Sequence, residues 1–175
     1  MPEPSDMAAP QLQPGELQKW RFLAAAPHLD CRDAKIQKLA ARLLECAQRD
    51  PVRFANLAQC VARDNVRFVR DTARIGEEDI AGYTRVPGRL DAVEALVRGW
   101  DDCDAKARLF VALCLAVGIP ARMEKIVNRA GALQHVYGLV ELDGAWLPVE
   151  LTLRRARVGD DPYTVPKEVD GQWLR

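Results

Sequence analysis

The sequence predicts an α+β domain in which one central helix packs on an antiparallel sheet of three or more strands, with additional N-terminal helices. Three observations support this prediction. An almost uniformly apolar helix follows Trp100, two β-rich runs flank Asp143-Gly144, and the N-terminal half repeats its apolar residues at helical spacing. A chain of 175 residues is long enough for one such domain. We expect that domain to span residues 16–175.

The N-terminal part is predicted to be helical after a short tail. Residues 1–15 are rich in proline and lack periodicity, so we expect a flexible, solvated tail there. Helical spacing predicts a helix over 33–49, and Asp50-Pro51 is typical of the end of one helix and the start of the next. We expect a loop over 76–88 and a short helix over 89–98.

The central helix carries a cysteine in its first turn. Asp101 and Asp102 are good N-cap residues, and Gly118 with Pro120 ends the helix. Cys103 therefore lies where backbone N–H groups and the helix dipole favour a thiolate. The neighbouring aspartates oppose that effect, so a reactive Cys103 requires a basic partner.

A β-hairpin follows the central helix. Residues 122–127 alternate as a strand does, and Asp143-Gly144 between two β-rich runs is a strong signal for a two-residue turn. In that register Leu142 pairs with Ala145, Tyr137 with Glu150, and His135 with Thr152. His135 and Glu150 then share one face of the hairpin as diagonal neighbours within side-chain reach.

This histidine is the candidate basic partner of Cys103. The chain has only two histidines, and His28 reads as a surface or packing residue. We expect the central helix to lie on the face that carries His135. A cysteine, a histidine and a carboxylate form the nucleophile, base and orienting group of acyl-transfer enzymes.

Composition excludes several other classes. The 25 basic residues balance the 25 acidic ones without long charged blocks, so we expect neither nucleic acid nor a membrane surface as a partner. No signal segment or membrane-spanning run is recognisable. Five cysteines without CxxC spacing are typical of a reducing compartment, so we expect a cytoplasmic protein.

Two runs of this sequence resemble those of the transglutaminase-like superfamily, a branch of the papain-like cysteine enzymes. They are GWDDCDAKARLFVALCLAVGIPAR and LQHVYGLVELDGAWLPVELTL. Family members carry a cysteine at a helix start, within a G-D-C-D-D-like run that ends in G-I-P-A-R. A histidine at a strand start and a W-x-x-V-D-like strand bearing the acid follow. The resemblance covers residues 85–153 and implies a papain/transglutaminase-like core.

The resemblance also implies a role for each candidate residue. Cys103 matches the nucleophile, His135 the general base, and Glu150 the position usually held by aspartate. It implies acyl transfer or hydrolysis at the amide bonds of a protein or peptide, through an acyl-thioester and without a cofactor. The backbone N–H of Cys103 is a natural oxyanion donor, and Gln134 and Tyr137 are candidates for the second donor.

Alternative interpretations concern the activity and the other cysteines. A non-catalytic binding or assembly module could keep the same fold. A zinc site formed by Cys103, His135 and Glu150 is not expected, because the spacing suggests no further ligand. The remaining cysteines are expected to be inert core residues; they are Cys31, Cys46, Cys60 and Cys114.

Overall fold

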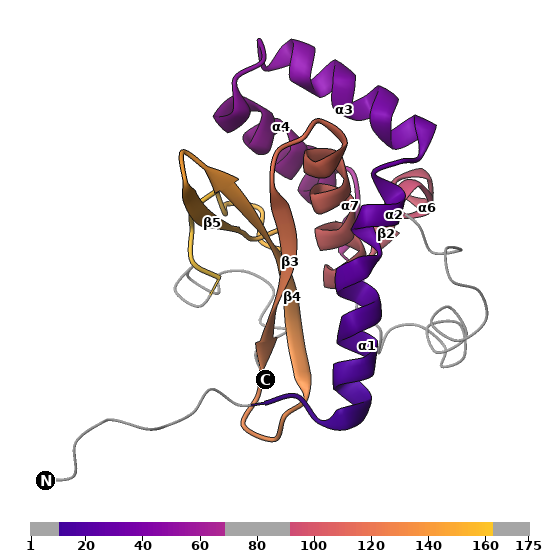
Figure 1. Ribbon diagram of the computed structural model, residues 1–175, viewed down its shortest axis with the longest axis vertical. Helices are drawn as coiled ribbons and strands as arrows, with labels where there is room; N and C mark the ends of the chain where they lie inside the picture. Colours follow the sequence, from indigo (N-terminus) through magenta and orange to yellow (C-terminus); the bar gives the residue numbers. More distant parts are fainter. Residues whose placement is uncertain (1–10, 69–91, 163–175) are drawn as a thin grey trace, which may run out of the picture.

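The computed structural model describes residues 11–68 and 92–162, in which helices precede a small sheet and lie along one side of it and over its top in the view of Figure 1. A three-stranded antiparallel sheet with helices before it confirms the predicted fold class. The loop expected over 76–88 and the first residues of the helix expected over 89–98 lie outside the described residues. In chain order the elements are α1 (Pro14–Ala25), α2 (Pro27–Asp30), α3 (Ala34–Cys46), α4 (Pro51–Asp64), β1 (Arg67–Phe68), α6 (Ala92–Arg98), β2 (Trp100–Asp101), α7 (Cys103–Ala116), β3 (Ala121–Val127), β4 (Leu133–Leu142) and β5 (Ala145–Val149).

The N-terminal helices begin largely where the sequence predicts. The side chain of Asp33 caps α3 by accepting from the N–H of Lys35, and that of Asp50 caps α4. The expected tail differs over its last residues, because α1 already begins at Pro14. The N–H of Gln13 also donates to the carbonyl of Gly131 at 3.0 Å, which ties this end of the chain to the β3–β4 connection. Residues 1–10 of that expected tail lie outside the described residues.

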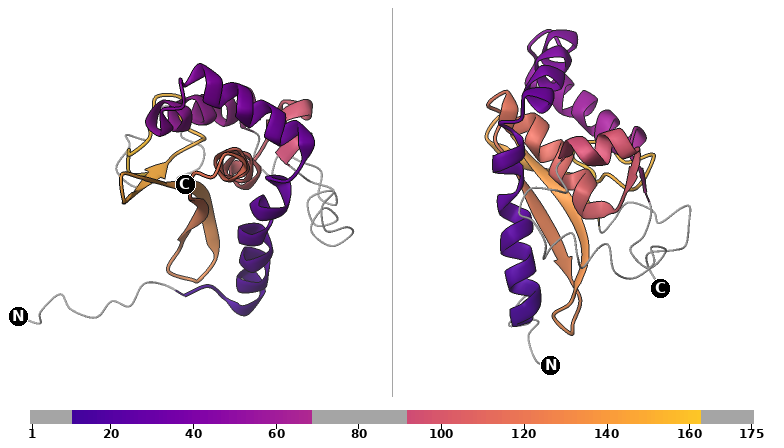
Figure 2. Two further views of the ribbon diagram at one scale, coloured as in Figure 1. Left: turned by 45° about the horizontal axis from the view of Figure 1, so that its top comes forward. Right: turned by 90° about the vertical axis from the view of Figure 1, so that its right-hand side faces the viewer.

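The central element is α7, which contacts the sheet and most of the described helices. Viewed almost along its axis, α7 is surrounded by the other helices and the sheet (Figure 2, left). Its residues from Lys106 to Cys114 are all buried, as expected for a helix at the centre of a core. Its C-terminal end is a Schellman motif: Gly118 adopts φ +79°, its N–H donates to Leu115, and the N–H of Ile119 donates to Cys114.

The sheet has the order β3-β4-β5 and the predicted hairpin register. Leu142 pairs with Ala145, and Asp143 and Gly144 both adopt positive φ, as a type I′ turn requires. The ladder ends at the pair Gly138–Val149, so the expected pairs at Tyr137 and His135 lie beyond its last paired residues. Two further short strands, β1 and β2, form a separate parallel pair that leads into α7.

The face of the sheet that α7 covers differs from our expectation. Phe110 of α7 lies against Gly138, so closely that a Cβ atom on Gly138 would be 2.7 Å from the phenyl ring. Gly138 points to the same face as Val136 and Val140, whereas strand alternation assigns His135, which borders the irregularity in this ladder, to the opposite face. The helix α7 therefore covers the face of the sheet whose aliphatic side chains it can bury. The prediction that α7 lies on the face of His135 is therefore wrong for the middle of the helix, at Phe110. Cys103 begins the helix two turns earlier, so this contact does not determine its position.

The close contact between Gly138 and the ring of Phe110 leads to a prediction about stability. We expect Gly138→Ala to lower the free energy of unfolding by about 1–3 kcal/mol, because the added methyl group overpacks a fully buried ring. Denaturant unfolding followed by circular dichroism measures the change. The control is Gly15→Ala in α1, where a Cβ atom meets nothing within 4 Å and stability should not fall. Equal stability of the two variants would contradict the proposed packing.

Candidate active site

Cys103 is the first residue of α7, as predicted. The side chain of Asp102 caps the helix by accepting from the N–H groups of Asp104 and Ala105, each at 3.2 Å. Asp101 in turn accepts from the N–H of Asp102 at 2.9 Å. Cys103 is partly buried and packs against the hydrophobic core. The fold thus places a thiol at the positive end of the central helix.

His135 and Glu150 meet as a buried pair. Nε2 of His135 lies 2.7 Å from Oε2 of Glu150, and both side chains are almost completely buried. Glu150 directly follows β5 and His135 lies near the start of β4, so the hairpin turn determines their encounter. The sequence therefore predicted this contact correctly, even though the strand ladder ends before reaching it.

The second carboxylate oxygen of Glu150 is held in place by its own chain. Oε1 accepts from the N–H of Leu151 at 2.8 Å, and from both the N–H and the hydroxyl of Thr152 at 2.6 Å each. These contacts orient the carboxylate so that Oε2 is presented to His135. The sequence reading missed Thr152, whose only signal was a hydroxyl two residues after the candidate acid.

The carboxylate of Glu150 is favoured in its ionised form. Burial alone raises the pKa of this carboxyl, but hydrogen bonds from His135 and Thr152, together with the electrostatic attraction of His135, offset burial, and the pKa is lowered. Because an ionised carboxylate can only accept, we assign the proton of the neutral imidazole to Nε2. Nδ1 is then the ring nitrogen that can take a proton from a nucleophile.

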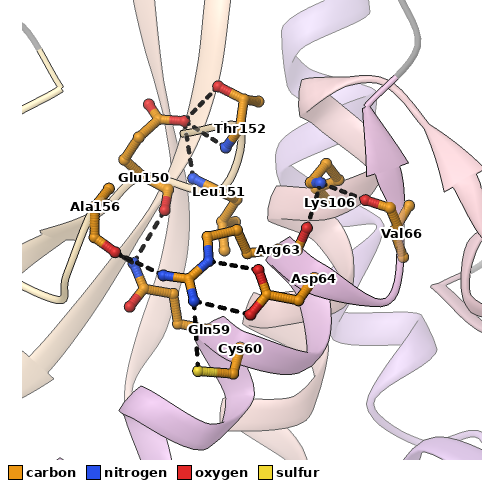
Figure 3. A network of polar contacts seen from close by, with 10 residues as sticks. All are labelled: Gln59, Cys60, Arg63, Asp64, Val66, Lys106, Glu150, Leu151, Thr152 and Ala156. Carbon is orange, nitrogen blue, oxygen red and sulfur yellow. Dashed lines mark hydrogen bonds and ion pairs between the residues drawn. The ribbon is translucent and has the colours of Figure 1, made fainter. Parts of the chain in front are cut away.

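Gln59 of α4 fixes the backbone around Glu150 (Figure 3). Its amide donates to the carbonyl of Glu150 at 3.0 Å and to that of Ala156 at 3.2 Å, and Arg63 donates to the same Ala156 carbonyl at 2.7 Å. The sequence reading missed Gln59. Its signal was a polar side chain among the alanines that form the buried face of α4.

The candidate second oxyanion donors lie on the same strand as His135. Tyr137 is buried and stacks with the imidazole ring, with centroids 6.4 Å apart. Gln134 is exposed and occupies the irregularity in the pairing of β3 with β4. Both stay candidates for that role.

The other cysteines differ in their surroundings. Cys114 is buried in the core as expected, and burial raises the pKa of its thiol far above the usual range. Cys46 and Cys60 are exposed and Cys31 is partly buried, so the expectation of core positions is wrong for these three. Cys46 ends α3, and Cys60 lies on the outer side of α4, where its sulfur accepts a hydrogen bond from Arg63 at 3.7 Å.

Neither a metal cluster nor a membrane span is found in the described part of the chain. Over residues 11–68 and 92–162, no group of three or more histidine, cysteine, aspartate or glutamate side chains is arranged to hold a metal ion. Within the same ranges every helix is too short or too polar to span a lipid bilayer.

Comparison with solved structures shows a similar fold in larger proteins. A proposed protease from Parabacteroides distasonis ATCC 8503 matches with a TM-score of 0.53 and 15% identity, over 75% of this chain and 26% of that one. A proposed cysteine protease from Cytophaga hutchinsonii matches with a TM-score of 0.50 and 19% identity, over 81% of this chain and 43% of that one. This chain thus spans less than half the length of either protein.

Comparison at the level of sequence families is more specific. None of the curated proteins matches this chain. The model of the transglutaminase-like superfamily matches residues 37–151, a range that includes Cys103, His135 and Glu150. The chain therefore belongs to the transglutaminase-like superfamily.

Proposed function

We propose that this chain is a cysteine-dependent enzyme that cleaves or transfers the acyl group of protein or peptide amides, with Cys103, His135 and Glu150 as its catalytic residues. The observation that supports it best is the 2.7 Å contact between His135 and Glu150, in which the carboxylate is oriented by three further hydrogen bonds. The position of Cys103 at the start of a helix that packs on β4 adds to it. Membership of the superfamily supplies the expectation of acyl chemistry.

The mechanism follows from these roles. Nδ1 of His135 takes the proton of the Cys103 thiol, and Glu150 stabilises the resulting imidazolium through Nε2. The thiolate attacks the amide carbonyl, and the backbone N–H of Cys103 donates to the oxyanion. The imidazolium then protonates the leaving nitrogen as the C–N bond breaks, which releases ammonia or an amine and leaves an acyl-thioester on Cys103. Water completes a hydrolysis, whereas an amine acceptor completes a transamidation.

Alkylation of the native protein tests the nucleophile. At about pH 5.5 we expect Cys103 to react with iodoacetamide about tenfold faster than any other cysteine, because only a thiol paired with a base is ionised at that pH. Each cysteine is quantified separately by peptide mass spectrometry. Cys46 and Cys60 are the internal controls, since both are more exposed than Cys103 and lack a histidine partner among their described contacts.

The comparison must be made at low pH. At about pH 9 ordinary thiols are largely ionised, so exposure then governs the rates and the two exposed cysteines should react fast. If Cys103 reacts no faster than Cys46 at low pH, the nucleophile assignment fails. The chain would then be a binding or assembly module with the transglutaminase-like fold.

A further inference from the structure

Lys106 is a buried lysine one helical turn after Cys103. Its exposed fraction is only 2%, although lysine is among the residues least often buried. Its ammonium donates to the carbonyl of Arg63 at 2.9 Å and to the carbonyl of Val66 (Figure 3). A cation in this place must be stabilised by the groups around it.

The two acceptors belong to the C-terminal end of α4 and the segment that follows. Carbonyls in the last turn of a helix lack partners within the helix, and this end of the dipole favours a cation. Directly after Val66, Arg67 pairs with Trp100 in the β1–β2 strand pair, and its N–H donates to the carbonyl of Gly99 at 2.8 Å. Lys106 thus connects the end of α4 and the strand pair that precedes α7 to the first turn of α7.

Charged groups on two other elements face Lys106. Burial lowers the pKa of Lys106 to about 8, although the carboxylates of Asp64 and Glu150 favour its charged form and Arg63 opposes it. Asp64 is ionised, because its hydrogen bonds with Arg63 lower the pKa of its carboxyl. The ammonium is therefore charged below neutral pH and lies within electrostatic reach of Glu150.

The same helix, α4, supports the other half of the candidate site. Gln59 of α4 holds the carbonyl of Glu150, and the end of α4 receives the ammonium of Lys106. We propose that Lys106 is a positioning residue, whose ammonium fixes the first turn of α7 on α4. In this way α4 holds both Cys103, through Lys106, and Glu150, through Gln59. This inference rests on the proposed function.

The test is the pH profile of Cys103 alkylation in Lys106→Met, with the fold checked by circular dichroism. Methionine fills similar space without donors or charge. We expect the rate at about pH 5.5 to fall about tenfold and the midpoint of the profile to move to higher pH, because the first turn of α7 is no longer held on α4 and Cys103 loses its placement beside its base.

Arg108→Met is the matched control on the same helix. Arg108 is also buried, and its guanidinium donates to Oδ1 of Asp30 at 2.7 Å. Removing it leaves the carboxylate of Asp30 buried without this partner, so it disturbs packing at least as much as Lys106→Met does. We expect its Cys103 profile to match that of the unmodified protein.

Two results would overturn the proposal: an unchanged profile in Lys106→Met, or an equal shift in both variants, which would indicate general loosening. If Lys106→Met does not fold, Lys106→Gln is judged by the same comparison, because its amide keeps donors but lacks the charge and the reach. Failure of the proposed function is distinct, since Cys103 would then be slow in the unmodified protein.

Discussion

His135→Ala is expected to slow the alkylation of Cys103 at about pH 5.5 by about tenfold or more. An unassisted thiol with a pKa near 8.5 is only about 0.1% ionised at that pH. Pairing with an imidazole raises the thiolate fraction by up to about a thousandfold. Part of this gain is lost, because the thiolate of a more acidic thiol is a weaker nucleophile. The logarithm of its rate falls by about 0.4–0.5 for each unit by which the thiol pKa is lowered. For a thiol pKa lowered by about three units, the net loss on removing the imidazole is about tenfold to thirtyfold.

The chain offers a matched control for this substitution. His28 is its other histidine and lies exposed on α2, so His28→Ala should leave the Cys103 profile unchanged. Rates are again measured for each cysteine by peptide mass, and the exposed Cys46 should react equally in both variants. A His135→Ala protein that retains rapid low-pH alkylation would exclude His135 as the base.

The hairpin and its histidine–carboxylate pair were predictable because local rules determine them. Asp143-Gly144 specifies a turn with positive φ at both residues, and that turn sets the register of every residue along both strands. The caps at Asp33, Asp50 and Asp102 likewise depend only on neighbouring residues.

The seating of α7 was not predictable in the same way. Alternation along β4 separates two faces of the sheet but does not say which face a helix covers. The deciding contact, Phe110 against Gly138, joins two segments distant in sequence and depends on the absence of a side chain at a single position. The expectation that the central helix covers the face of His135 therefore fails at Phe110.

The polar support of the site was also hidden from the sequence. Gln59 and Lys106 are residue types usually found at the surface, and only tertiary packing reveals that both are buried. Their partners are backbone carbonyls of residues distant in sequence, which carry no side-chain signature. The opposite happens at Cys46 and Cys60: cysteine is so often buried that its residue type predicts a core position, yet both are exposed.

Glu150→Gln is expected to raise the midpoint of the Cys103 alkylation profile and to lower the rate at about pH 5.5 about tenfold, while the fold is retained. The three donors at Oε1 determine how the new amide lies. Its carbonyl oxygen must keep accepting from Leu151 and Thr152, so its NH₂ group faces Nε2 of His135. A donor at that position places the imidazole proton on Nδ1, the nitrogen that should accept the proton of Cys103.

Glu150→Asp separates this tautomer effect from a simple change of shape. Aspartate keeps the charge but is one methylene shorter, so it should give an intermediate profile if the segment after β5 can move toward His135. Imidazole nitrogen NMR reads the tautomer directly: the Nε2–H form should dominate in the unmodified protein and the Nδ1–H form in Glu150→Gln. If Glu150→Gln keeps the normal profile while His135→Ala loses it, Cys103 and His135 act as a dyad. The buried carboxylate would then serve only to hold the start of β4 against the segment that follows β5.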